Sequence, residues 1–483
     1  MKIRKFFDSL SVFILVSIIT SQCFAQSPAA SQKKEEIENR KYLEVINSLY
    51  YYIQQNYVDD VDPQLLYEGA IKGMLQALDD PYSTYMGKSD WRSLTDTTVG
   101  SFGGVGLSIT KPAQSTKEKP AYVRVAAPID NSPGARAGIQ SGDFIVKIDG
   151  VDTSTISMEE VLGMLRGTVG ESVTVRIRRS TVEFDKTLVR AVIENPTVKY
   201  GMINSTGYIL LTEFSTATAD RVQEAIDSFK KAGYTGLIID LRNNGGGLLS
   251  SAVDIADKFI DEGVIVSTKS RIEYENATFY AEKKDTVVRN IPVVVLVNES
   301  SASASEILAG ALKDSKKAYL VGTKTYGKGS VQVPTGLINN DGFKITVAKY
   351  YSPSDVNIDK VGILPDEEVK SPEFTKEEEE AFKKLLESSE IEKYVAAHPK
   401  MTEQEIVSYA KQLKSKYNLE DRILRKLVRN ESELSMQPSR LYDLDYDLQL
   451  KRALEIVKSP VFDKLIKNSK TLKQQSEENS VKK

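Results

Sequence analysis

The sequence is poor in two residues that carry much of protein chemistry, with one histidine and one cysteine in 483 residues. His398 lies in a charged segment near the C-terminus, far from the serine-rich segment around Ser303, so a serine nucleophile there cannot readily use the common imidazole base. Cys23 stands alone, which excludes an internal disulfide and a zinc–thiolate site. A serine nucleophile in this chain would need another base, and lysine is the candidate.

The composition has no strong excess of charge or of apolar residues. The formal net charge is -3, with 27% charged and 41% hydrophobic residues, as in ordinary globular proteins. This charge argues against a strongly basic nucleic-acid-binding protein, and we expect no nucleic-acid partner. The length predicts about three domains.

Residues 1–25 have the features of a secretory signal peptide. Lys2, Arg4 and Lys5 precede an apolar run at residues 10–19, and small residues at positions 23 and 25 predict cleavage after Ala25. We therefore expect an exported, periplasmic protein. A retained membrane anchor is the alternative, although the run is shorter than the roughly 20 residues that span a bilayer. A lipoprotein modified at Cys23 is disfavoured because Gln22 precedes it.

Residues 26–99 predict a helical region. Apolar side chains recur at helical spacing in residues 43–53 and again in residues 65–78, with a start signal at Asp62 and Pro63 and a stop at residues 79–81. We interpret this region as a packing or dimerisation module, so a homodimer formed through the helical termini is a possible assembly.

Residues 100–190 alternate like short strands, with one helix expected at residues 158–166. The run SPGARAGIQSGDFIVKIDG resembles a PDZ domain. In PDZ domains a glycine-rich loop binds the C-terminal carboxylate of a peptide, which adds a strand to the sheet edge. Here that loop would be Gly104, Val105, Gly106 and Leu107. With Leu162 and Leu165 nearby, we expect apolar C-termini to be preferred.

Residues 191–370 have an α/β pattern. A buried strand, TGLIIDLR, runs directly into Asn243, Asn244 and three glycines at residues 245–247. Such a loop permits positive φ or the close approach of a ligand to the backbone. A purely structural turn is the open alternative at this position.

The serine-rich segment at residues 301–305 follows a second buried strand, VVVLV, and precedes a helix, EILAGAL. A nucleophile at this helix N-terminus would gain unpaired backbone N–H groups and a favourable helix dipole for a developing oxyanion. The alternative is that these serines only cap the helix.

A second segment, GTKTYGKGSVQ, places Lys328 between Gly327 and Gly329. Residues 322–328 also fit the start of a phosphate-binding loop, GxxxxGK. That motif needs Ser or Thr after the lysine and then a helix, whereas this chain has Gly329 and a strand-like run. We therefore exclude nucleotide binding and expect no cofactor and no metal.

These segments together resemble the C-terminal processing peptidases, also called tail-specific proteases. The resemblance rests on SSASASEILAGALKD, GTKTYGKGSVQ, DLRNNGGG and the PDZ-like region, and it extends over residues 37–365. It implies a multidomain α/β (α+β) fold, with a crotonase-like catalytic domain, an inserted PDZ domain and helical N- and C-terminal regions. One departure is DDPYS at residues 79–83, where the family more often has LDPHS.

The resemblance also implies roles for individual residues. Ser303 matches the nucleophile, Lys328 the general base, and Gln332 a glutamine that orients the lysine. The oxyanion hole would use the N–H of Ala304 and a glycine of the loop. The oxyanion-hole glycine matches Gly246, with Gly247 as the alternative. Arg166 matches an arginine through which the PDZ domain communicates with the active site.

A lysine acts as a base only when it is neutral, so the pKa of such a lysine must fall from about 10.4 toward neutrality. Burial between glycines, with a carboxamide as the neighbour, would favour the neutral form. We interpret Glu306, in the helix after Ser303, as a structural cap or an ion-pair partner.

Residues 371–483 lie outside the resemblance, and their function is not evident from the sequence. We expect helices at residues 376–387, 406–417 and 448–457, a surface position for His398, and a disordered polar tail at residues 464–483.

Two functions fit these patterns. The first is a periplasmic Ser/Lys endopeptidase that binds and cleaves proteins or peptides with apolar C-termini, with an adaptor or regulator protein as a possible partner. The second is a catalytically inactive PDZ scaffold. The joint presence of Ser303, Lys328, Gln332 and the glycine loop favours the enzyme.

Overall fold

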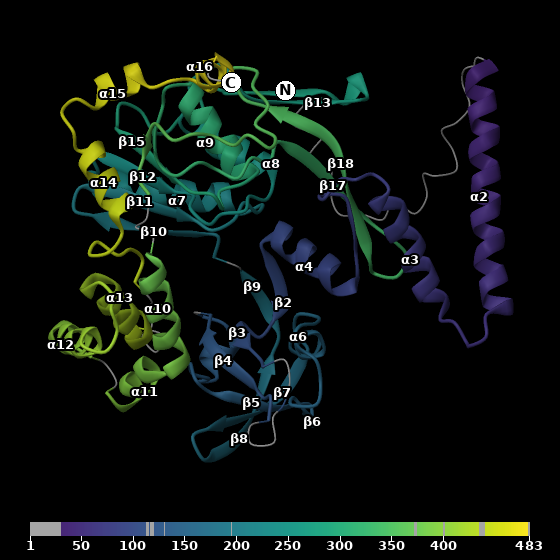
Figure 1. Ribbon diagram of the computed structural model, residues 1–483, viewed down its shortest axis with the longest axis horizontal. Coiled ribbons are helices and arrows are strands. Elements are labelled where there is room, and N and C mark those ends of the chain that lie inside the picture. Colours follow the sequence, from purple (N-terminus) through teal and green to yellow (C-terminus); the bar gives the residue numbers. More distant parts are fainter. Residues whose placement is uncertain are drawn as a thin grey trace. The chain divides into compact units, whose positions relative to one another are not determined.

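The computed structural model describes most of the chain after the predicted signal peptide, which lies outside the described residues together with Cys23. The described residues are 30–481, except 113–114, 116–119, 130, 195, 371–373, 399–400 and 434–439. The chain divides into two compact units. Figure 1 labels the helices and strands. The first unit comprises the described residues within 1–95, 270–273 and 330–349, and the second comprises those within 96–269, 274–329 and 350–483.

The first unit contains the two helices expected from the sequence. These are α2 (Ala30–Asn56) and α3 (Pro63–Gln76). The side chain of Asp62 accepts a hydrogen bond from the N–H of Gln64 at 2.8 Å, so Asp62 caps α3. Strand β1 (Thr84–Met86) pairs with β18 (Gly342–Tyr351), and β18 forms an antiparallel hairpin with β17 (Ser330–Gly336). No helix among the described residues is both long and apolar enough to cross a membrane.

The second unit begins near the end of α4 (Lys88–Val99) and continues into a PDZ domain. Its main sheet has the strand order β3-β4-β5-β7-β8, with β6 paired to β5. The strands are β3 (Leu107–Thr110), β4 (Val123–Pro128), β5 (Phe144–Ile148), β6 (Val151–Asp152), β7 (Ser172–Arg179) and β8 (Val182–Val189). Helices α5 (Pro133–Arg136) and α6 (Met158–Leu165) complete the domain, and a separate pair joins β2 (Ser101–Gly104) to β9 (Ala191–Glu194).

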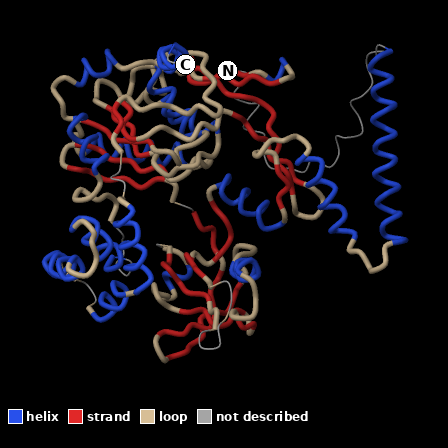
Figure 2. Tube along the Cα trace, viewed as in Figure 1, coloured by secondary structure: helices blue, strands red, loops and turns tan. Residues whose placement is uncertain are grey.

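The remaining part of the second unit is built on a six-stranded sheet, seen as a red layer in Figure 2. Its order is β10-β11-β12-β15-β16-β19, and all neighbouring pairs except β10 with β11 are parallel. The strands are β10 (Val198–Ile203), β11 (Thr206–Leu211), β12 (Gly236–Asp240), β15 (Val293–Val297), β16 (Tyr319–Gly322) and β19 (Glu367–Glu368). Strands β12, β15 and β16 are buried throughout, as expected for central parallel strands covered on both faces.

Helices connect these strands in the α/β pattern that the sequence predicts. They are α7 (Thr218–Lys231), α8 (Leu249–Asp257) and α9 (Ala304–Asp314). A further antiparallel pair, β13 (Val264–Ser270) and β14 (Ala277–Tyr280), lies between α8 and β15 in the sequence, with a short helix η1 (Glu273–Glu275). The fold is therefore a mixed helix-and-sheet structure with a PDZ domain.

The C-terminal region is helical. It comprises α10 (Lys376–Ser388), α11 (Glu390–Ala397), α12 (Glu403–Lys414), α13 (Asp421–Glu433), α14 (Leu448–Val457), α15 (Phe462–Asn468) and α16 (Leu472–Val481). His398 is exposed and stacks on Tyr394, as a surface residue would. The expected disorder after residue 464 is wrong, because Phe462 and Leu472 are buried and tie α15 and α16 to the fold. The few apolar side chains scattered through this polar segment were too weak a signal to predict this.

Candidate active site

The serine-rich segment forms the turn between strand β15 and helix α9. Ser303 is the N-cap residue of α9, with φ 56° and ψ -116°. These angles are costly for a residue that has a Cβ, and such strain is concentrated at functional sites. The Ser303 side chain is half-buried, and Ala304 starts the first turn of α9, where the helix leaves N–H groups unpaired. The turn thus holds a hydroxyl group at a helix N-terminus.

The glycine-rich loop after strand β12 packs directly against this turn. Gly246 has φ +104°, and a Cβ at this position would lie 2.7 Å from the carbonyl oxygen of Ala302 and 2.8 Å from Cβ of Ser303. Gly247 has φ +139°, and a Cβ there would lie 2.1 Å from the carbonyl oxygen of Phe214. Both positions therefore require glycine, because any side chain would push the loop away from the turn.

Asparagine and serine side chains tie the glycine loop to the serine turn. The carbonyl oxygen of Asn244 accepts from the N–H of Ala302 at 3.0 Å and from Oγ of Ser305 at 2.9 Å. Asn243 and Asn298 form a reciprocal pair. The backbone N–H of Asn243 donates to Oδ1 of Asn298 at 2.9 Å, and Nδ2 of Asn298 donates to Oδ1 of Asn243 at 2.9 Å. These bonds fix the spacing between the loop and Ser303.

One N–H of the loop is used within the loop itself. The N–H of Gly246 donates to Oδ1 of Asn244 at 2.8 Å, and Asn244 is fully buried. The Nδ2 of Asn244 donates to the carbonyl oxygen of Leu211 at 2.8 Å, which holds the amide in this orientation. Asn244 is therefore a central support of the loop.

Lys328 lies in the segment that connects strands β16 and β17, and its side chain is half-buried. The flanking glycines allow this segment to pack closely on residues 358–362. A Cβ on Gly329 would lie 2.4 Å from the N atom of Asp359, and a Cβ on Gly327 would lie 2.8 Å from the N atom of Gly362. Glycine is therefore required on either side of Lys328 because a side chain there would clash with the backbone of residues 358–362.

The buried carboxylate of Glu306 joins the lysine segment to the serine turn. Its Oε2 accepts from the N–H of Ser303 at 3.0 Å and of Lys328 at 2.9 Å. Its Oε1 accepts from Oγ1 of Thr325 at 2.5 Å and from the N–H of Gly327 at 2.8 Å. Burial raises the pKa of Glu306, although these four donors act in the opposite direction. The expected capping role is present, but the carboxylate also bridges two segments.

Tyr350 makes a second bridge between the same two segments. Its hydroxyl group donates to the carbonyl oxygen of Lys328 and lies 3.3 Å from the carbonyl oxygen of Ser303. Tyr350 is itself buried, with 3% of its surface exposed. Two buried side chains therefore hold the backbones of Ser303 and Lys328 at one place.

Known proteins match the domains of the chain and about three quarters of its length. Residues 205–369 match the family model for peptidase family S41, residues 124–179 match a PDZ domain, and residues 9–90 match the N-terminal domain of the activating protease CtpB. The carboxy-terminal-processing protease of Bartonella bacilliformis is 36% identical over 367 residues, which cover 75% of this chain and 82% of that protein. The chain belongs to peptidase family S41.

Two further S41 proteins are similar to this chain. The carboxy-terminal processing protease CtpA of Bacillus subtilis is 35% identical over 380 residues, covering 78% of this chain and 79% of that protein. A solved structure of the photosystem II D1 C-terminal processing protease has 30% identity and a TM-score of 0.40, covering 67% of this chain and 92% of that one. As a member of the family, the protein is a serine-type peptidase with a PDZ domain.

Of the residues expected in this S41 peptidase, Gln332 lies in strand β17 of the first unit. Its Nε2 donates to Oγ of Ser330 at 2.9 Å and to Oγ1 of Thr346 at 3.2 Å. Thr346 donates in turn to Oδ2 of Asp80 at 2.6 Å, and so does Ser83 at 2.6 Å. The DDPYS run, where the sequence departs from the family, thus supports the partner of Gln332.

Arg166 lies beside the glycine-rich loop of the PDZ domain. A Cβ on Gly104 would lie 3.8 Å from Cγ of Arg166, and the guanidinium is 4.4 Å from the centre of the Phe102 ring. Arg166 also forms an ion pair with Asp96 in the last turn of α4. Residues of α4 contact the protease part of the same unit, because Oγ1 of Thr216 donates to the carbonyl oxygen of Val99 at 2.8 Å.

Asp240 and Arg242 belong to the DLRNNGGG run and flank Leu241 at the end of strand β12, but the sequence suggested no role for either of them. Arg242 pairs with Asp240, and the hydroxyl group of Tyr208 donates to Oδ2 of Asp240 at 2.8 Å. Burial acts to lower the pKa of Arg242, but its hydrogen bonds to Asp240 and Asp447 outweigh this and raise it. Two opposite charges directly after a buried strand were the available signal.

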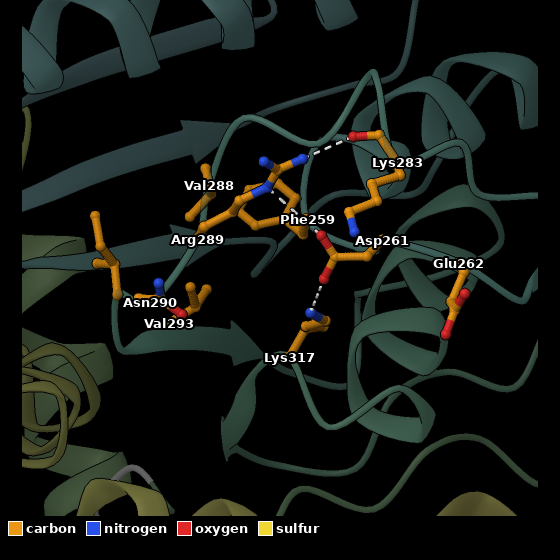
Figure 3. Close-up of a pocket in the computed structure, with 10 residues that line it drawn as sticks. Phe259, Asp261, Glu262, Lys283, Val288, Arg289, Asn290, Val293 and Lys317 are labelled. Atoms are coloured by element: carbon orange, nitrogen blue, oxygen red, sulfur yellow. Dashed lines mark hydrogen bonds and ion pairs between the residues drawn. The ribbon is translucent and has the colours of Figure 1, made fainter.

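A cavity of about 400 Å³ lies elsewhere, at the other end of strand β15 (Figure 3). It adjoins Val293, where β15 begins, whereas Ser303 follows the end of the strand. Three of its charged side chains pair with one another, with Asp261 bound to Lys317 at 2.6 Å and to Arg289 at 3.5 Å. The cavity is not part of the candidate active site. Within the described residues, no cluster of three or more His, Cys, Asp or Glu side chains could hold a metal ion.

Proposed function

We propose that this S41 peptidase is an exported endopeptidase that recognises unstructured, apolar C-termini of proteins through its PDZ domain and cleaves them with Ser303 and Lys328. One observation carries the assignment of these two residues. Glu306 and Tyr350 each contact both the Ser303 turn and the Lys328 segment, so two segments with different chemistry are held together by buried side chains. Such over-determined geometry is what a nucleophile and its base require.

In the proposed mechanism, Oγ of Ser303 attacks the scissile carbonyl carbon while the neutral amine of Lys328 takes its proton. Lys328 then returns the proton to the leaving amine. Water then attacks the acyl-enzyme while Lys328 takes a proton from it. The bond between the acyl carbon and Oγ of Ser303 breaks, Lys328 returns the proton to Oγ, and the second product leaves. The mechanism needs no metal and no cofactor.

The oxyanion of the tetrahedral intermediate would bind at the N-terminus of α9 and at the glycine loop. The N–H of Ala304 is the first proposed donor. For the second donor, Gly246 is the closer residue to Ser303, but its N–H already donates to Asn244. Because this bond occupies the N–H of Gly246, Gly247 is favoured as the second donor. Gly246 would serve only if substrate displaced its bond to Asn244.

Gln332 is proposed to orient the amine of Lys328. The amide is itself positioned by Ser330 and Thr346, as an orienting group should be. A carboxamide at this place would hold the lysine without stabilising its charged form as a carboxylate would.

The PDZ domain offers the edge of strand β3 to a peptide, because β3 ends the strand order of its sheet. Gly104, Val105, Gly106 and Leu107 lead into this strand and would receive the peptide carboxylate. Val105 is 3% exposed and belongs to the PDZ core, whereas Leu107 is half-buried and remains in reach of a ligand. Arg166 beside this loop is proposed to transmit peptide binding through Asp96 and α4.

The remaining proposals concern architecture and location. We propose a crotonase-like catalytic domain, a PDZ domain inserted before it, and export to the periplasm directed by residues 1–25. Homodimer formation through the helical termini is supported by exposed apolar side chains on α2, namely Tyr42 at 65%, Leu43 at 64% and Val45 at 65% exposure. An adaptor or regulator could use the same surface.

The test is digestion of an unfolded protein with an apolar C-terminus. We expect Ser303→Ala and Lys328→Ala to lower kcat by at least about 1,000-fold, since each removes a reacting group. Ser300→Ala and Lys324→Ala are matched controls, because both are exposed residues of the same two segments and should retain activity. The wild-type rate should rise between pH 6 and pH 9 as Lys328 loses its proton.

The same experiment decides against the alternative. A catalytically inactive PDZ scaffold would bind the substrate without digesting it, and all variants would then behave alike. A rate that fell steadily from pH 6 to pH 9 would reject lysine as the base.

A further inference from the structure

The C-terminal region consists of two parts with separate packing. Helices α10 to α13 form a core of their own, which includes Leu385, Leu413 and Leu424. Helix α14 instead packs on the central sheet of the protease part. Its buried side chains join the cluster formed by β12, β15 and β16, and the cluster includes Ile238, Val294, Leu296, Val321, Leu450, Ala453, Ile456 and Val457. Helix α14 therefore completes the core of the protease part.

A glycine at the start of strand β12 allows α14 to pack closely on the strand. A Cβ on Gly236 would lie 2.8 Å from Cγ2 of Val457, so α14 approaches the strand more closely than a side chain would permit. The boundary predicted at residue 370 separates the sheet from the helix that covers it. Figure 1 shows α14 beside β12.

The first turn of α14 also reaches the base of the glycine loop. Oδ1 of Asp447 accepts from Nη1 of Arg242 at 2.9 Å, and its Oδ2 accepts from Nη2 at 2.6 Å. Gln449 adds a third contact, with its Oε1 3.0 Å from Nη1 of Arg242. Asp447 additionally caps α14, because its Oδ1 accepts from the N–H of Leu450 at 2.9 Å. The guanidinium is thus held by Asp447 on one side and by Asp240 on the other.

Arg242 is the residue directly before the glycine loop. Its backbone N–H donates to Oδ1 of Asp240 at 3.0 Å, so both its backbone and its side chain are fixed. The next residues include Asn244, which binds Ala302 and Ser305, and Gly246, which touches Ser303. Displacement of Arg242 would therefore move the loop relative to the serine turn.

The end of the C-terminal region contacts the helix that carries Ser303. Oδ1 of Asp314, the last residue of α9, accepts from the N–H of Leu472 at 2.7 Å. Lys316, just beyond α9, donates to the carbonyl oxygen of Ser469. A Cβ on Gly310 would lie 3.3 Å from the side chain of Leu472. Helices α14 to α16 and their connections therefore contact both Arg242, before the glycine loop, and α9, which follows Ser303.

We propose that helices α14 to α16 are part of the catalytic domain, and that Asp447 is a positioning residue that holds the glycine loop in place through Arg242. This rests on the proposed function for its effect on turnover. The consequence is that a segment outside the matched S41 region sets the geometry of the oxyanion hole.

The test is Asp447→Asn, which separates the two tasks of this side chain. Asparagine caps helices as well as aspartate does, so α14 should remain folded, while Arg242 loses one of its two carboxylates. We expect kcat to fall by about 10- to 100-fold with KM changed less than about 2-fold, because a small misplacement of the loop affects the transition state. The control is Asp463→Asn, an exposed aspartate of α15, which should leave kcat unchanged.

Hydrogen exchange of the same proteins gives a measurement that does not depend on proteolysis. In Asp447→Asn, the backbone amides of residues 241–248 should exchange faster than in the wild type. Those of residues 448–457 should exchange at the wild-type rate. Unchanged kcat with unchanged loop exchange would overturn the proposal, and so would faster exchange of both peptides, which would indicate loss of α14. If the wild type cleaves nothing, the proposed function fails, and loop exchange still decides whether Asp447 positions the loop.

Discussion

The protein contains two glycine-rich loops that are expected to face a peptide, one in the PDZ domain and one in the protease part. In the PDZ loop, Gly106 has φ +69° and packs on Ser132, whose Oγ donates to the carbonyl oxygen of Gly106 at 3.0 Å. In the protease loop, Gly246 packs on Ser303, and Asn244 binds the serine turn. The first loop is anchored within the PDZ domain, and the second is joined to the turn that carries the proposed nucleophile.

This difference has a kinetic meaning. A loop that only receives the end of a substrate contributes the same binding energy in the ground state and in the transition state, so changing it alters affinity. A loop that sets the position of an oxyanion contributes mainly in the transition state, so changing it alters turnover. Glycine substitutions in the two loops should therefore separate KM from kcat.

The largest effect is expected for Gly246→Ala. The new Cβ would lie 2.8 Å from Cβ of Ser303 at φ +104°, so either the nucleophile or the loop must move. We expect kcat to fall by at least about 1,000-fold, measured with a peptide substrate and checked by the rate at which a phosphonate labels Ser303.

Gly245→Ala is the matched control for this variant. A Cβ at Gly245 would meet nothing within 4 Å, although the residue is adjacent in the same loop. Near-normal turnover is expected for it. Equal losses in the two variants would show that alanine at either position disturbs the loop. The close contact between Gly246 and Ser303 would then not explain the loss of turnover.

An intermediate effect is expected for Glu306→Gln. The amide keeps one acceptor oxygen but places an NH₂ group against backbone N–H groups of Ser303 and Lys328 or of Gly327. We expect kcat to fall by about 10- to 100-fold, because the spacing between nucleophile and base is disturbed while both remain present.

Glu299→Gln serves as the comparison for Glu306→Gln. Glu299 is exposed and lies in the same turn as Ser303, and its carboxylate accepts a hydrogen bond from Oγ1 of Thr323 at 2.9 Å. It should leave kcat unchanged, and the thermal midpoints of both variants should be recorded. If Glu306→Gln retained full turnover, the bridge between the two segments would be structural only.

The sequence predicted the strands, turns and helices around the proposed site well. Ser303, Lys328 and the glycines of residues 245–247 belong to short motifs next to recognisable strands and helices, and the chain folds them as such. Helix α14 was also predicted at its observed bounds, because its apolar side chains repeat at helical spacing.

The supports of the site could not be predicted in the same way. Asp447 is 205 residues from Arg242, and Tyr350 is 47 residues from Ser303, so no local pattern connects them. Glu306 has a local signal for a helix cap, but its bonds to Gly327 and Lys328 depend on tertiary folding. Motifs in the sequence thus pointed to the proposed reacting groups, whereas the groups that hold their segments together are visible only in the fold.

The smallest effect on turnover is expected for Gly106→Ala in the PDZ loop. A Cβ there would lie 2.2 Å from Cβ of Ser132, so the loop that would receive a carboxylate must shift. The substrates are two versions of one unfolded protein, with a free and with an amidated C-terminus. We expect the wild type to prefer the free carboxylate by about 10-fold in kcat/KM, and the variant to lose this preference through KM. Gly163→Ala, in α6 with nothing within 4 Å of its Cβ, is the control and should keep it. Circular dichroism confirms that the PDZ domain stays folded. A folded Gly106→Ala protein that still preferred the free carboxylate would show that the two glycine loops do not divide recognition from turnover.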